Sequence, residues 1–189
     1  MAKPVIGVMG ASENDALSEP ERARLRQLAE RLGTVLAQHA CILVTGATTG
    51  LPDMVAKAFR RCGGFALGIS PAQDRKEHLK RYGLPDDGSD VIVYTGFGYK
   101  GRNVVNVRSA DLVIIFGGAT GTLNEFTIAY DEGKIIGILE ESGGVADHIK
   151  EIIGFCKKPT QGLVVFNKDP EKLVEMCLET WAFSTTAQD

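Results

Sequence analysis

Asp111-Leu-Val-Ile-Ile-Phe-Gly-Gly-Ala-Thr-Gly-Thr-Leu-Asn-Glu125-Phe-Thr-Ile-Ala-Tyr130 is the stretch that decides the fold. The apolar run 112–116 is short and rich in β-branched residues, which is typical of a strand covered on both faces in a parallel sheet. The glycines that follow allow a sharp turn with bare backbone N–H groups. An amphipathic helix comes next. A strand, a glycine turn and a helix N-terminus in this order form a geometry that binds phosphate, because free N–H groups and the positive end of the helix dipole point the same way.

Glu125 has two interpretations at this stage. Thr122-Leu-Asn-Glu125 fits the Ser/Thr-x-x-Glu capping pattern, in which the Glu125 carboxylate would accept from the Thr122 N–H. Alternatively, Glu125 is a catalytic carboxylate facing a ligand held by the glycine turn. The two interpretations conflict in part, because a capped helix start leaves fewer N–H groups for phosphate.

Outward from this stretch, short apolar runs alternate with helical patterns along the whole chain. Such alternation indicates βαβ units and a three-layer, Rossmann-like α/β fold, with a mostly parallel sheet and helices on both faces. A polar, Pro- and Gly-containing segment from 70 to 90 interrupts it and is expected to lie over the ligand edge of the sheet. The expected strands are 5–9, 41–44, 65–69, 91–94, 112–116, 135–139 and 162–166, and the later helices are 51–61, 102–108, 145–155 and 170–181.

Composition places the chain among ordinary intracellular globular proteins. Its 189 residues suit one nucleotide-binding domain, 1–189, with a polar and frayed tail from about 182. The net charge of −3 and the scattered Lys and Arg residues give no basic surface for nucleic acid. No apolar run reaches the roughly 18 residues that a membrane span needs. The four cysteines lack CxxC spacing and are expected to be reduced. We therefore expect a cytoplasmic protein without membrane or nucleic-acid partners.

Several familiar motifs are excluded by their context. Gly96-Phe-Gly-Tyr-Lys-Gly101 has the letters of a dinucleotide fingerprint, but it follows the wrong strand and lacks an acidic residue about 20 positions on. Neither glycine turn is followed by the Gly-Lys-Ser/Thr of a Walker A loop. The three histidines stand apart, so neither a metal site nor a histidine-based triad is expected.

Lys100 and Arg102 are expected at the start of a helix, where the dipole makes a cation unfavourable by roughly 0.3–1 kcal/mol. A neighbouring anion would make a cation at this position favourable instead. They are therefore either solvated side chains on a loop, or they include an Arg102 that holds a phosphate or carboxylate through its planar fork.

With these residues the chain resembles the LOG ("lonely guy") family, Rossmann-like proteins often labelled lysine decarboxylase-like. The family motif is Pro-Gly-Gly-x-Gly-Thr-x-x-Glu, with an upstream Arg in a Met-His-x-Arg-Lys context. Gly117-Gly-Ala-Thr-Gly-Thr-Leu-Asn-Glu125 takes the place of the first motif, and Arg102 lies 23 residues before Glu125. Leu43-Val-Thr-Gly-Ala-Thr-Thr-Gly50 is similar to the family's second glycine turn. The motif's Pro is Gly117 here, its second Gly is Ala119, and the Lys after the Arg is Asn103, which indicates a divergent, bacterial-type member.

The resemblance implies a phosphoribohydrolase that cleaves the N-glycosidic bond of a nucleoside 5′-monophosphate to free base and ribose 5-phosphate. Glu125 and Arg102 would be its catalytic residues, no cofactor is implied, and a homodimer is expected. The loop 96–101 would close over the ligand, and the segment 70–101 would determine the base. The expected phosphate- and ligand-binding residues are Gly10, Ser12, Gly46, Thr48, Thr49, Gly50, Gly117, Gly118, Ala119, Thr120, Gly121 and Thr122.

An alternative of a different class stays open. Proteins of this superfamily also resemble nucleotide sensors and molybdenum-cofactor carriers, which bind a phosphorylated ligand without chemistry. Because some motif residues are substituted in this chain, a non-catalytic carrier remains an alternative to the enzyme. Base release from nucleoside monophosphates separates the two, since a carrier would bind without turnover.

Overall fold

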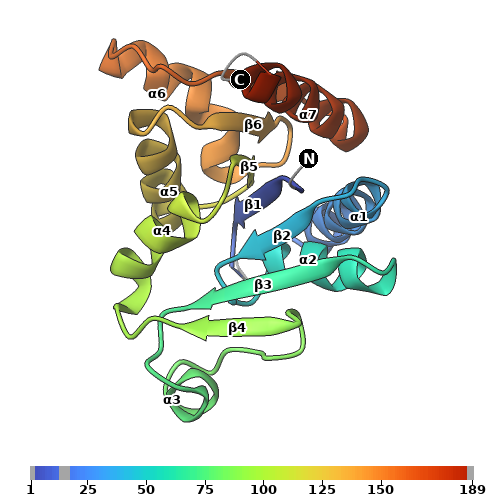
Figure 1. The fold of residues 1–189 in the computed structure, drawn as a ribbon, viewed down its shortest axis with the longest axis vertical. Coiled ribbons are helices and arrows are strands. Elements are labelled where there is room, and N and C mark those ends of the chain that lie inside the picture. Colours follow the sequence, from blue (N-terminus) through green and yellow to red (C-terminus); the bar gives the residue numbers. More distant parts are fainter. Residues whose placement is uncertain (1–2, 13–17, 187–189) are drawn as a thin grey trace.

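The computed structural model, shown in Figure 1, describes residues 3–12 and 18–186 and has a parallel sheet between two layers of helices. The strands are β1 (Val5–Gly10), β2 (Ile42–Thr45), β3 (Phe65–Ser70), β4 (Val91–Tyr94), β5 (Leu112–Phe116), β6 (Ile135–Leu139) and β7 (Val164–Asn167). The helices are α1 (Glu19–Ala37), α2 (Leu51–Arg61), α3 (Arg75–Lys80), α4 (Gly98–Arg108), α5 (Thr120–Asp131), α6 (Ile149–Cys156) and α7 (Pro170–Thr186), with a 3-10 turn, η1, at Gly144–His148.

The sheet order is β4-β3-β2-β1-β5-β6-β7, and every neighbouring pair is parallel. The predicted three-layer Rossmann-like fold is thus confirmed. The chain moves outward in one direction from β1 to β4 and then returns to add β5 on the other side of β1. Because the order reverses between β1 and β5, the crevice beyond their carboxyl ends is where such sheets bind ligands.

Apolar side chains fill both sides of the sheet. Helices α1, α2 and α7 cover one face and α4, α5 and α6 cover the other (Figure 1). Strand β5 is buried along its whole length, as the unbroken run 112–116 predicts. The described part of the chain contains no helix long and apolar enough to cross a membrane.

Strands β1, β2, β3 and β7 differ from the sequence prediction by one or two residues at an end, and three helical boundaries differ by more. Helix α4 begins at Gly98 instead of about 102, so most of the expected closing loop 96–101 is the first helical turn. Helix α7 extends to Thr186, past the tail predicted from about 182. The segment predicted as one helix over 145–155 is a 3-10 turn followed by α6.

The segment 70–90 lies over the ligand edge, as expected, and is held there by a buried histidine. His78 on α3 is fully buried. Its Nε2 lies 2.9 Å from the Pro85 carbonyl oxygen, to which it donates, and its Nδ1 lies 2.8 Å from the Ser70 hydroxyl. His78 therefore ties the end of β3 to the returning chain, which gives the 70–90 segment a fixed position beside the site.

Candidate functional site

The turn between β5 and α5 depends on two glycines. Gly117 and Gly118 have φ angles of +61° and +97°, a region that residues with a Cβ rarely occupy. A Cβ on Gly118 would lie 2.3 Å from the Thr122 Oγ1. The Gly117 N–H donates to the Ser142 Oγ at 2.9 Å. Gly117 was predicted to bind the ligand, but its amide is occupied by Ser142, so its contribution is to shape the turn.

The N-terminus of α5 is open. Its N-cap residue is Ala119, which makes no side-chain cap, and its first turn contains no acidic residue. Among the described residues, no acceptor bonds the N–H groups from Gly118 to Thr122. The predicted capping box is wrong, because α5 begins at Thr120 and Glu125 therefore lies in the second turn. These amides remain available to an anion.

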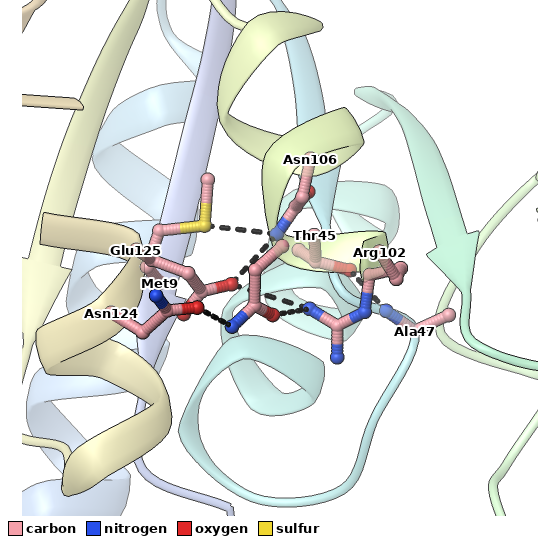
Figure 2. Close-up of polar contacts among 8 residues, drawn as sticks. Met9, Thr45, Ala47, Arg102, Asn106, Asn124 and Glu125 are labelled. Atoms are coloured by element: carbon pink, nitrogen blue, oxygen red, sulfur yellow. Dashed lines mark hydrogen bonds and ion pairs between the residues drawn. The ribbon is translucent and has the colours of Figure 1, made fainter. Parts of the chain in front are cut away.

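Glu125 instead forms a buried ion pair with Arg102. The Arg102 Nη1 donates to the Glu125 Oε1 at 3.2 Å, and the two residues are 5% and 6% exposed. The Asn106 Nδ2 donates to the same oxygen at 3.1 Å and lies 3.0 Å from the Met9 sulfur (Figure 2). Within the described residues no hydrogen bond reaches the Glu125 Oε2. One carboxylate oxygen is thus fixed by Arg102 and Asn106, and the other accepts no hydrogen bond from the described residues.

Side chains and backbone around Arg102 fix the orientation of its guanidinium. Its Nη1 also donates to the Asn103 Oδ1 at 3.1 Å, and the Asn103 Nδ2 donates to the Asn124 Oδ1 at 2.9 Å, which links α4 to α5. The guanidinium packs against bare backbone at Gly46, where a Cβ would lie 2.3 Å from the Nη1. The glycine after β2 is therefore required by the arginine that faces it.

Burial dominates the electrostatics of the pair. It raises the pKa of Glu125 above its ordinary 4.5, while the Arg102 charge and the Asn106 hydrogen bond lower it. Burial likewise lowers the pKa of Arg102, against the Glu125 charge. The Arg102 Nε and the Asn106 Oδ1 are buried without a hydrogen-bond partner. A carboxylate in such surroundings is suited to proton transfer.

A cavity of about 660 Å³ lies over this pair at the carboxyl ends of the strands. It brings the three predicted glycine turns together with Arg102 and Glu125. The predicted ligand-binding residues on its wall are Gly10, Ser12, Gly46, Thr48, Thr49, Gly118, Ala119, Gly121 and Thr122. The predicted residues that do not line it are Gly50, Gly117 and Thr120, of which the first two are buried in their turns and the third faces solvent.

The sequence reasoning missed several residues of the site. Asn106 carried a usable signal, because it lies one helical turn after Arg102 in an otherwise valine-rich segment, so both face the same side of the helix. Tyr82, Leu84 and Tyr99 also line the cavity. The first two lie in the 70–90 segment, whose path the sequence pattern does not specify.

The fold and this site define a LOG-like protein of the Rossmann type. A family model described as the SLOG cluster4 family matches residues 3–174, and the chain belongs to that family. A protein of Archaeoglobus fulgidus is 30% identical over 80% of this chain and 93% of its own length. A cytokinin riboside 5′-monophosphate phosphoribohydrolase of Mycobacterium tuberculosis is 30% identical over 62% of this chain and 60% of its own length.

Solved structures of whole proteins are also similar. The molybdenum cofactor binding protein of Rippkaea orientalis is 27% identical, with a TM-score of 0.76 over 95% of this chain and 98% of that one. The molybdenum cofactor carrier protein of Chlamydomonas reinhardtii is 26% identical, with a TM-score of 0.71 over 94% and 99%. The relatives therefore include both a hydrolase and cofactor-binding proteins.

Proposed function

We propose that this protein is a phosphoribohydrolase that cleaves the N-glycosidic bond of a nucleoside 5′-monophosphate, giving free base and ribose 5-phosphate. The observation that carries the proposal is the buried Arg102–Glu125 pair on the wall of the same cavity as the unpaired amides of α5. The likeness to the mycobacterial phosphoribohydrolase supports it.

Each part of the cavity has a chemical task in this reaction. The 5′-phosphate binds the amides from Gly118 to Thr122, where the helix dipole stabilises negative charge. Bond cleavage passes through an oxocarbenium-like state, which a nearby carboxylate stabilises. Glu125 supplies that charge and accepts a proton from the attacking water. The water oxygen bonds to the anomeric carbon, and the base leaves with the electron pair of the broken C–N bond. The base takes up a proton from solvent, and Glu125 returns the proton it accepted to solvent, so the carboxylate is restored.

Arg102 is a positioning residue in this scheme. Its Nη1 and the Asn106 amide both bond the Glu125 Oε1, so the carboxylate has one orientation, with Oε2 free for the water. Because burial raises the Glu125 pKa, the carboxylate is a stronger base than an exposed glutamate.

The test is Glu125→Gln, which keeps an oxygen that can accept from Arg102 and Asn106 but removes the charge and the base. We expect base release from nucleoside monophosphates to fall by at least about 100-fold, while ribose 5-phosphate binding in calorimetry is retained. Glu132→Gln, at the far end of α5 and paired with Arg108, is the matched control and should keep full activity. Retained turnover in Glu125→Gln would contradict the proposal.

A second candidate is a carrier of a phosphorylated cofactor. Its support is the likeness to the two molybdenum cofactor proteins, which extends over nearly the full length of both chains, whereas the likeness to the hydrolase covers 62% of this one. A thermal-shift screen with nucleoside monophosphates, run beside the base-release assay, separates the candidates. Ligand-dependent stabilisation without turnover would favour the carrier.

We also propose a cytoplasmic homodimer with a small-molecule nucleotide ligand, on the strength of the family assignment. Light scattering after size-exclusion chromatography tests the oligomeric state: a mass near twice the 20.3 kDa of the chain is expected.

A further inference from the structure

Two tyrosines from separate segments meet on the wall of the cavity. Tyr82 lies in the 70–90 segment after α3, and Tyr99 lies in the first turn of α4. Their ring centroids are 5.3 Å apart and the rings are nearly perpendicular, at 86°. Edge-to-face contact is a favourable arrangement for an aromatic pair, so each ring helps to fix the other.

The two rings are not equally available to a ligand. The Arg81 guanidinium carbon lies 5.6 Å from the Tyr82 ring centroid, so one side of that ring has a cation over it. Tyr99 is 45% exposed although it lines the cavity. Tyr99 is therefore the ring with more surface available to a ligand, and Tyr82 packs against it.

The support is itself held in place. Tyr82 lies between buried His78 and buried Leu84, and the Leu84 N–H donates to the His78 carbonyl oxygen at 3.1 Å. Gly83 has a φ of +63°, which fits the tight turn between them. Tyr82 is thus positioned before any ligand arrives, which lowers the entropy cost of forming a binding surface.

The tyrosine pair and the open amides belong to segments that follow different strands of the sheet. The amides follow β5, whereas the 70–90 segment follows β3, and these strands are three spacings apart, about 14 Å. Tyr99 is one helical turn before Arg102, whose guanidinium holds Glu125. Arg102 therefore links the helix that carries Tyr99 to Glu125 on α5, and a ligand that spanned from the α5 amides to the Tyr99 ring would lie beside this pair.

We infer that Tyr99, supported by Tyr82, is the stacking surface for the flat heteroaromatic base of the ligand, and that it holds the base without taking part in bond cleavage. The choice of ligand rests on the proposed function. Stacking on an aromatic side chain suits any planar base and needs no hydrogen-bond partner.

The experiment compares ligands with and without a base. Binding of AMP, GMP and ribose 5-phosphate is measured by calorimetry for the wild type, Tyr99→Ala, Tyr99→Leu and Tyr99→Phe. We expect the wild type to bind AMP or GMP more tightly than ribose 5-phosphate. Tyr99→Ala and Tyr99→Leu should weaken that nucleotide by about tenfold or more and leave ribose 5-phosphate within about twofold. Tyr99→Phe keeps the ring and should bind like the wild type.

Phe97→Ala is the matched control. Phe97 is an aromatic residue two positions away that is 66% exposed and does not line the cavity, so its removal should change neither affinity. Tyr82→Ala should give a smaller loss than Tyr99→Ala. Melting curves of every variant verify folding, and Tyr99→Leu, which keeps most of the side-chain volume, guards against local collapse.

In the binding experiment, three results would overturn the inference: equal losses for nucleotide and ribose 5-phosphate, no loss in Tyr99→Ala and Tyr99→Leu, or no preference of the wild type for a nucleotide. Base release is measured in parallel. Ring-dependent nucleotide binding without base release would keep the stacking surface and refute the proposed hydrolase. Base release with an unchanged KM in Tyr99→Ala would keep the hydrolase and refute the stacking surface.

Discussion

The turns after β2 and β5 contain the same three residues, Gly-Ala-Thr, at 46–48 and 118–120, yet their helices begin in opposite ways. At the start of α2, the Leu51 N–H donates to the Ala11 carbonyl oxygen, Pro52 has no N–H, and Asp53 places a carboxylate in the first turn. At the start of α5, the amides have no acceptor among the described residues and the first turn has no acid. The protein thus occupies part of the α2 terminus, whereas the first amides of α5 stay open to water or an anion.

The two turns therefore make different contributions to one cavity. The β2 turn provides a flat backbone surface at Gly46, against which the Arg102 guanidinium packs. The β5 turn provides hydrogen-bond donors. Glycine is needed at the first turn for close approach of a side chain, and at the second for a backbone with positive φ. The same three residues thus have different structural roles in the two turns.

The largest effect is expected from Gly46→Ala, which fills the space that the Arg102 guanidinium occupies against the backbone. The new Cβ would lie 2.3 Å from the Arg102 Nη1, so the guanidinium must move away from Glu125. We expect base release to fall by about 100-fold, since small misplacements of catalytic groups have that effect. The free energy of unfolding should fall by about 1–3 kcal/mol, as for other overpacked sites. Enzyme kinetics and urea unfolding measure the two quantities.

Gly154→Ala provides the control for that comparison. Gly154 lies on α6, is exposed, and has open space where a Cβ would go. This variant should keep full activity and gain a little stability, because alanine favours a helix over glycine by about 0.5–1 kcal/mol. Full activity in Gly46→Ala would mean that Arg102 does not depend on the bare backbone.

A smaller effect is expected from placing an acidic residue at the start of α5, as α2 already has at its own start. Ala119→Asp places a carboxylate at the N-cap, where it can accept from the amides of the first turn. Unfolding free energy without ligand should rise by about 1 kcal/mol, while affinity for ribose 5-phosphate should fall by about tenfold through competition and like charge. Calorimetry and thermal melting measure the two changes.

Ala119→Ser caps the helix without a charge and separates these causes. It should give part of the stabilisation with a weaker loss of affinity. If Ala119→Asp stabilised the protein and still bound ribose 5-phosphate normally, the anion site would have to lie elsewhere in the cavity.

The fold could be predicted from the sequence because buried parallel strands have a strong local signature. The β5 strand over 112–116, the β4 strand over 91–94 and the α2 helix over 51–61 match the prediction residue for residue. The β5–α5 amides were predictable for the same reason, since a glycine turn between a strand and a helix is a local pattern. The capping box at Thr122 failed because α5 begins two residues earlier, at Thr120, and Glu125 pairs with the distant Arg102 and Asn106.

The remainder of the site depends on contacts between distant segments. Ser142, which occupies the Gly117 amide, is 25 residues away in the sequence, and Tyr82 contacts Tyr99 from a segment that His78 ties to Pro85 and Ser70. No local periodicity encodes such pairings. The part of the cavity wall around Tyr82 and Tyr99 was therefore beyond sequence reasoning, whereas the glycine turn with the open α5 amides was within it.

The smallest effect is expected from Asp53, the acidic residue in the first turn of α2, a turn that contains no acidic residue in α5. Asp53 bonds Lys57 at 2.9 Å, and burial raises the pKa of Asp53 above its ordinary 3.8 while Lys57 lowers it. An acid with a raised folded pKa keeps its proton while the unfolded chain loses it, so stability falls as pH rises from about 3.8 through the folded pKa. Asp53→Asn removes this dependence. Between pH 3.8 and the folded pKa, the unfolding free energy of the variant should fall less than that of the wild type, and the difference should be under about 1 kcal/mol.

Asp87 offers a control of opposite sign on the same lysine. Its hydrogen bond with Lys57 holds its pKa below the ordinary 3.8, so its contribution is present above 3.8 and is lost as pH falls through the folded pKa. Asp87→Asn should therefore reduce the loss of unfolding free energy below pH 3.8, whereas Asp53→Asn should change the unfolding free energy above pH 3.8. Urea unfolding at pH 3 to 6 measures both. If the two variants changed the curve over the same window, the acid at the α2 terminus would behave as an exposed surface charge, and the contrast with α5 would rest on the amides alone.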